Sequence, residues 1–155
     1  VSTANYGIPV IGRILPFLGA LPIVDSLHGM KELNKAMEQR LKKGHPIVIY
    51  PEAHVWEYYT DIRPFPNTSF KFPIKFDIPA FAMTVTYRKA KFFKRPIMEV
   101  YIDGPFYPQG DNTREKTANL HSEIRSIMLE RSKNSNYKYY LSYSMSHNIS
   151  PNSKI

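Results

Sequence analysis

Apolar residues recur at helical spacing within a strongly charged segment near the start of the chain. From Met30 to Lys43 they stand three or four positions apart, which is typical of an amphipathic helix. Ser26 is the expected N-terminal cap of this helix, and Gly44 its stop. Ahead of it, residues 8–18 predict a short helix or an irregular hairpin, and residues 21–24 a short strand.

A second helix is predicted from Thr113 to Arg131, with Asn112 or Thr113 as its cap. Its apolar stripe consists of Leu120, Ile124, Ile127 and Met128. A shorter helix is predicted over Thr68 to Phe76, although Pro73 weakens it.

Three apolar runs predict longer strands. Residues 46–50 are apolar without alternation, as in parallel strands that are buried on both faces. Residues 79–86 and 97–102 predict two further strands, joined by a hairpin over residues 88–96, and Gly104-Pro105 is expected to end the last one. Between the first two runs, residues 52–67 predict a long polar and aromatic loop.

A helix followed by a buried strand suggests a βαβ unit. We therefore expect an α/β fold with a mostly parallel sheet covered by helices and some antiparallel pairing near residues 88–95. The expected domain organisation is one partial α/β domain over residues 1–132 and a polar tail, rich in Tyr, Ser and Asn, over residues 133–155. The end of this tail is expected to be disordered.

Composition narrows the class of partner. The 155 residues carry a net charge of +8, which favours an anionic partner such as a phosphate ester, a nucleic acid or an anionic membrane. The chain has no cysteine, so disulfides and thiolate chemistry are excluded and an intracellular setting is expected. The apolar segment of residues 8–24 is too short and too interrupted by proline and glycine for a membrane-spanning helix.

Three short motifs carry a family resemblance. Tyr50-Pro51-Glu52 follows an apolar run, Ile78-Pro79-Ala80-Phe81 comes about 25 residues later, and an apolar glycine-containing segment ending at Asp25-Ser26 precedes both. In this order and spacing they resemble motifs of the glycerolipid acyltransferases, which acylate 1-acyl-glycerol-3-phosphate and related acceptors. The resemblance spans residues 5–132. It implies an acyl thioester donor, either acyl-CoA or acyl-carrier protein, and a lysophospholipid-like acceptor, with no metal and no other cofactor.

The chain departs from the family at positions that bind phosphate. The family has Gly-Thr-Arg after the glutamate, where this chain has Ala53, His54 and Val55, and it has arginine where this chain has Ser26. These arginines help to bind the acceptor phosphate in the family, so another cation is expected to replace them. The candidates are Arg63, Lys71 and Lys75.

The family's catalytic base is a histidine followed, four residues farther on, by an aspartate. None of the five histidines of this chain has an aspartate at that spacing. We therefore expect no catalytic residue in this chain, a general base upstream of Val1, and little or no turnover by the 155 residues alone.

Glu52 is the residue that the resemblance assigns to the acceptor site. The structural alternative is that Glu52 caps its loop or pairs with Arg63. Within the chain, His54 is the alternative candidate for a general base, because it lies two residues from Glu52. A packed or hydrogen-bonded loop histidine is the structural alternative. The predicted substrate-binding residues are thus Glu52, His54, Arg63 and Lys71.

The stretch from Arg88 to Arg95 combines five cations with Phe92 and Phe93. On a hairpin tip this composition suits an anionic membrane surface, and it also suits the phosphates of CoA or of a nucleic acid; an ordinary solvated turn is the alternative. The predicted membrane or anion contacts are Arg88, Lys89, Lys91, Lys94 and Arg95.

The leading hypothesis is acyl transfer by a cytoplasmic protein at the membrane periphery, with a role in phospholipid biosynthesis. A catalytically degenerate module that binds lipid or a partner is the alternative. A nucleic-acid-binding protein is the weakest hypothesis because no recognised motif supports it.

Overall fold

The structure is a computed structural model that describes residues 11–14, 19–21, 26–52 and 56–139. The chain divides into two units, Val1–Ile49 and Tyr50–Ile155. Most of the predicted strand over residues 21–24 and the end of the predicted tail lie outside the described residues.

The first unit contains helix α1 (Ile11–Ile14) and helix α2 (Leu27–Lys42). The hydroxyl of Ser26 accepts a hydrogen bond from the Gly29 amide at 3.0 Å, so the predicted N-cap is confirmed. The predicted stop is also confirmed, because Gly44 takes a left-handed conformation with φ of 74°. Hydrogen bonds from the Gly44 and His45 amides to carbonyl groups of the last turn complete a glycine C-cap.

The predicted buried strand over residues 46–50 is wrong. The segment is irregular, and Val48, Ile49 and Tyr50 are exposed. An apolar β-branched run becomes a strand only when another strand pairs with it, and the described residues provide none for this segment.

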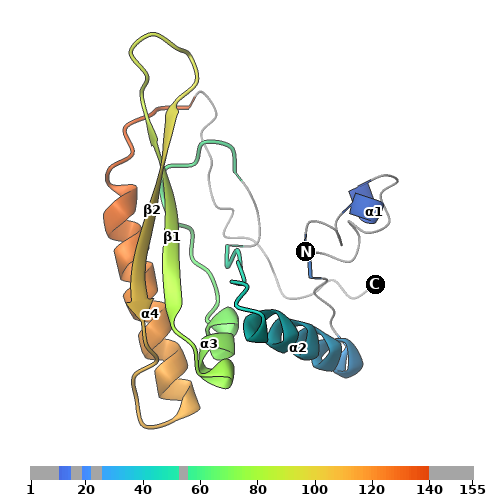
Figure 1. Ribbon diagram of the computed structural model, residues 1–155. Coiled ribbons are helices and arrows are strands. Elements are labelled where there is room, and N and C mark those ends of the chain that lie inside the picture. The colour runs from blue at the N-terminus through green and yellow to red at the C-terminus, as the bar shows by residue number, and fades with distance from the viewer. Residues whose placement is uncertain (1–10, 15–18, 22–25, 53–55, 140–155) are drawn as a thin grey trace, which may run out of the picture. The chain divides into compact units, whose positions relative to one another are not determined.

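The second unit is built on a long hairpin of strand β1 (Ala80–Arg88) and strand β2 (Ile97–Phe106). Figure 1 shows helix α4 (Thr113–Ser132) running along this hairpin. A 3₁₀ turn, η2 (Thr68–Phe70), leads into helix α3 (Lys71–Phe76), so the predicted short helix is confirmed. The predicted second helix and its Asn112 cap are confirmed as well, because Asn112 Oδ1 accepts from the Glu115 amide at 2.9 Å.

The two strands pair antiparallel, as a connection of eight residues requires. Pairing runs from Arg88 opposite Ile97 to Ala80 opposite Phe106, with an irregularity between Ala80 and Ala82. The strand therefore passes through Gly104-Pro105 instead of ending there. Gly104 has φ of 134°, and a Cβ at this position would lie 2.8 Å from Cδ1 of Phe81, so the close approach requires glycine.

The predicted fold class, a mostly parallel sheet covered by helices, is wrong. The sheet in the described part of the chain is the two-stranded antiparallel hairpin, and α4 covers one of its faces. The order of elements suggested a βαβ unit, but the run that would have supplied its second strand is irregular and exposed.

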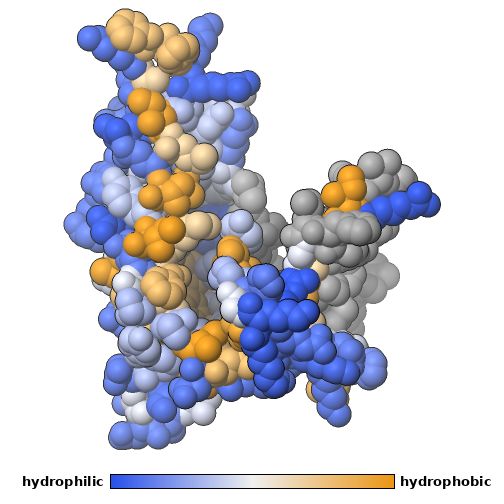
Figure 2. Space-filling model, in the orientation of Figure 1, coloured by the Kyte–Doolittle hydropathy of each residue, from blue (hydrophilic) through white to orange (hydrophobic). Residues whose placement is uncertain are grey.

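The face of the hairpin toward α4 is the more polar one. It carries alternate residues of both strands, namely Ala82, Thr84, Thr86, Glu99, Tyr101 and Asp103. The outer face is mainly apolar and carries Phe81, Met83, Val85, Met98, Val100 and Ile102, with Tyr87 opposite Met98 near its end. Figure 2 shows apolar side chains following the hairpin along its length.

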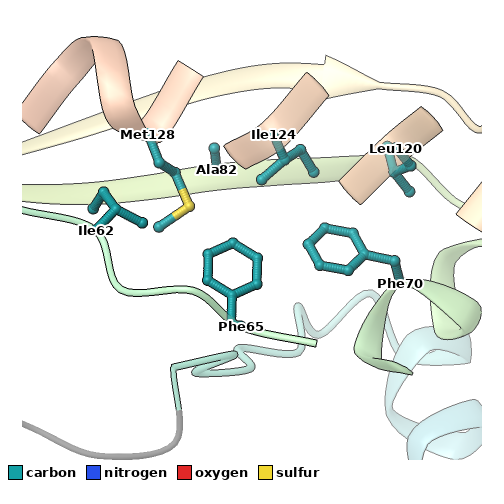
Figure 3. Close-up of a cluster of buried hydrophobic side chains, with 7 residues drawn as sticks. All are labelled: Ile62, Phe65, Phe70, Ala82, Leu120, Ile124 and Met128. Carbon is teal, nitrogen blue, oxygen red and sulfur yellow. The ribbon is translucent and has the colours of Figure 1, made fainter. Parts of the chain in front are cut away.

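The core lies between α4, β1 and the segment that precedes α3. Figure 3 shows its seven buried side chains, which are Ile62, Phe65, Phe70, Ala82, Leu120, Ile124 and Met128. Three of the four residues predicted for the stripe of α4 are among them, and the fourth, Ile127, is half-buried. The helical pattern therefore identified the packed face of α4 correctly.

No helix in the described part of the chain is both long enough and apolar enough to cross a membrane.

Candidate functional site

The Tyr-Pro-Glu turn is tied to the loop that follows it by one side chain. Glu52 Oε2 accepts hydrogen bonds from the backbone amide of Arg63 at 3.1 Å and from its Nε at 3.2 Å. Arg63 is only 8% exposed, and the Glu52 side chain is mostly covered. A charge-assisted pair of this kind, shielded from water, fixes the turn against the segment that enters the core.

Trp56 completes this arrangement. The guanidinium carbon of Arg63 lies 4.4 Å from the centroid of the indole ring, which is a cation–π distance. Tyr59 packs edge-on against the same indole at 5.0 Å. Burial raises the pKa of Tyr59, and the nearby Asp61 carboxylate acts in the same direction. Glu52, Arg63 and Trp56 form what we call the Glu52 cluster.

Of the four predicted substrate-binding residues, the structure brings Glu52 and Arg63 together. His54 lies outside the described residues. Lys71 lies exposed at the start of α3, and Lys75 lies exposed on the same helix with its Nζ 5.7 Å from the Phe76 ring. Pairing with Arg63 was the structural alternative to an acceptor-site role for Glu52. The structure contains this pair, which holds the loop between the two residues in place.

Other aromatic residues of the loop and of η2 lie in two places away from the Glu52 cluster. Phe65 and Phe70 belong to the core. Tyr58 has a positive φ of 53° and packs edge-on against the rings of Tyr87, Tyr137 and Tyr139, at centroid distances of 5.1 to 5.6 Å. These contacts join the loop, the end of β1 and the segment after α4. Burial, followed by the nearby Tyr58, raises the pKa of Tyr87.

His121 is a packed histidine. Its Nε2 lies 3.1 Å from the Phe65 carbonyl oxygen, and its ring packs edge-on against Phe65 and Phe70 at 5.2 Å. These contacts place the half-buried His121 beside Phe65 and Phe70 of the core, where it bridges α4 and the preceding loop.

The predicted anion-binding cations all lie at the end of the hairpin. Arg88 forms an ion pair with Glu99 across the two strands. Lys91 places its Nζ 5.4 Å from the centroid of the Phe92 ring. The remaining cations are exposed, and they are Lys89, Lys94 and Arg95. The hairpin tip therefore presents several cations on one short segment.

The sequence did not reveal a third ion pair of the second unit, which joins α4 to β2. Arg131 Nε donates to both oxygens of Asp103, at 3.0 and 3.2 Å, and its guanidinium lies 4.7 Å from the centroid of the Tyr101 ring. The hydrogen bond from Arg131 lowers the pKa of Asp103 and raises that of Arg131. The signal that could have revealed it is the alternation of Glu99, Tyr101 and Asp103, which puts three polar side chains on one face of a strand.

No family model matches the chain, and neither the curated proteins nor the solved structures include a similar one.

Proposed function

We propose that this chain is part of an acyltransferase. It moves a fatty acyl group from an acyl thioester, CoA or carrier protein, to a hydroxyl of a lysophospholipid or glycerol-phosphate-like acceptor. The general base is supplied by sequence outside these 155 residues, because none of the five histidines has the spacing from an aspartate that the resemblance requires. The protein works at the cytoplasmic side of a membrane, as a peripheral protein.

The observation that carries this proposal is the position of Arg63. Val55 stands where the family has arginine after the glutamate. In space, however, the largely buried Arg63 guanidinium lies against Glu52, so a cation adjoins the turn despite the substitution. A planar guanidinium suits a phosphate group better than an ammonium group does. Glu52 and Trp56 would act as positioning residues that hold this guanidinium in one orientation.

A direct test is a calorimetric titration of the chain with lysophosphatidic acid below its critical micelle concentration. We expect saturable binding that weakens about tenfold in Arg63→Lys. Lysine keeps the charge but cannot donate two parallel hydrogen bonds to one phosphate group as the planar guanidinium does. Glu130→Gln is the matched control, since Glu130 belongs to an exposed ion pair on α4. Equal affinity in wild type and Arg63→Lys would remove Arg63 from the acceptor site.

The alternative is a degenerate module that binds lipid or a partner without turnover. It is favoured by the loss of both family arginines, where this chain has Ser26 and Val55. The two functions are distinguished by whether the natural protein holds the family's histidine and aspartate outside these 155 residues. A histidine and an aspartate with four residues between them support the enzyme, and their absence supports the module.

A further inference from the structure

The tip of the β1–β2 hairpin exposes two phenylalanines among cations. Phe92 is 82% exposed and Phe93 is 79% exposed, and large apolar side chains are rarely left open to this extent side by side. The eight residues from Arg88 to Arg95 contain five cations and no acidic residue. The only carboxylate paired with these cations in the described part of the chain is Glu99, which binds Arg88 at the base of the tip.

The tip is held in place by the segment after α4. Asn136 Oδ1 accepts a hydrogen bond from the Lys89 amide at 2.8 Å, and the Tyr137 hydroxyl donates to the Lys94 carbonyl at 3.1 Å. These two bonds brace both sides of the turn. A braced loop presents its side chains without a large ordering cost on binding.

A shallow hollow of about 360 Å³ lies beside Phe93. Its lining consists of Ala90, Phe93, Lys94, Arg95, Pro96 and Ile97. Apolar walls with a cationic rim complement a molecule that has an anionic head and an apolar tail.

The apolar outer face of the hairpin adjoins the tip. Met98, Val100 and Ile102 continue along β2 on this face, and all three are exposed. Figure 2 shows the apolar surface passing from the tip down the strands. The charges are therefore concentrated at one end of a long apolar surface.

We propose that the hairpin tip and the adjoining outer face dock on a bilayer that contains anionic phospholipid. Phe92 and Phe93 enter the interfacial region, while Lys89, Lys91, Lys94 and Arg95 lie at the level of the phosphate groups. The apolar side chains explain the affinity for the acyl region, and the cations explain the preference for anionic lipid. This surface is separate from the Glu52 cluster, so the proposal stands without the acyl-transfer function.

The test is co-sedimentation of the whole chain with vesicles of phosphatidylcholine, with and without 30% phosphatidylglycerol. Each cation near an anionic surface contributes about fivefold in binding. Lys91→Gln combined with Lys94→Gln should therefore weaken binding about 25-fold. The matched control is Lys42→Gln combined with Lys133→Gln, which removes the same charge from exposed positions at the C-terminal ends of α2 and α4 and should weaken binding less than about threefold.

The apolar part is tested separately. Phe92→Ser combined with Phe93→Ser should weaken binding at least tenfold, while Leu27→Ser, at an equally exposed leucine on α2, should leave it unchanged. Equal binding to neutral and anionic vesicles, or equal loss in tip and control variants, would overturn the proposal. So would a dimer in sedimentation equilibrium that dissociates in the phenylalanine variant, because the surface would then bind a second copy of the chain.

Discussion

The ion pair between Glu52 and Arg63 should contribute measurably to the stability of the second unit. In Glu52→Gln the shape is kept, but the acceptor of two charge-assisted hydrogen bonds becomes neutral. Hydrogen bonds to charged groups contribute about 1.5–3 kcal/mol each, and the partial exposure of Glu52 favours the lower end. We expect a loss of about 2 kcal/mol, which corresponds to a Tm lower by about 4–8 °C for a chain of this size.

The assay is urea denaturation followed by circular dichroism, arranged as a double-mutant cycle with Arg63→Met. A coupling energy of about 1.5–2 kcal/mol between the two positions is expected, because the side chains are in direct contact. The control substitution, Glu130→Gln, breaks an exposed pair with Lys133 and should cost less than about 1 kcal/mol. Additive effects of Glu52→Gln and Arg63→Met would refute the claim that the pair fixes the turn.

Three further predictions concern the packing of α4 on the hairpin. Leu120→Ala should lower the free energy of unfolding, measured by chemical denaturation, by about 2–5 kcal/mol, because Leu120 is 1% exposed. In the control Leu27→Ala, at a residue that is 87% exposed, the free energy of unfolding should change by less than about 0.5 kcal/mol. Thr86→Val should raise Tm and stabilise by about 1 kcal/mol, because the fully buried hydroxyl has no hydrogen-bond partner among the described residues. Asp103→Asn should lower Tm most above about pH 5, and the difference from wild type should shrink below about pH 4. The sign follows from the lowered pKa of Asp103, whose stabilising charge is lost as acid protonates it, so a Tm difference that stays constant down to pH 2 would refute this role.

The sequence predicted the local elements of the second unit well because their patterns are self-contained. Alternation on 97–102 and the spacing of Leu120, Ile124 and Met128 reflect which face packs, and the structure bears out both. Cap residues such as Ser26 and Asn112 act within one turn of the chain, so they were also predictable.

The sheet was not predictable in the same way, because strand pairing depends on distant partners. The run over residues 46–50 has the composition of a buried strand, yet nothing in the described part of the chain pairs with it. Arg63 also depends on contacts that are distant in the sequence. The sequence named it both as a candidate for binding the acceptor phosphate and as a partner of Glu52, but could not decide between these two roles. The pair of Asp103 with Arg131 joins residues 28 positions apart. Alternation along β2 placed Asp103 on the polar face of the strand, but nothing in the sequence identified Arg131 as its partner.

Product formation distinguishes acyl transfer, with the acceptor held beside the Tyr50-Pro51-Glu52 turn, from lipid binding alone. The natural protein that contains these residues should be incubated with acyl-CoA and lysophosphatidic acid, and phosphatidic acid measured by thin-layer chromatography, beside the 155-residue chain alone. We predict transfer by the natural protein and a strong reduction of transfer in its Arg63→Lys variant. We also predict about 100-fold less product, or lower still, from the 155 residues alone, because none of their five histidines has the spacing from an aspartate that the resemblance requires of a general base. Normal turnover by the 155 residues alone, or no transfer by the natural protein, would contradict the proposed function.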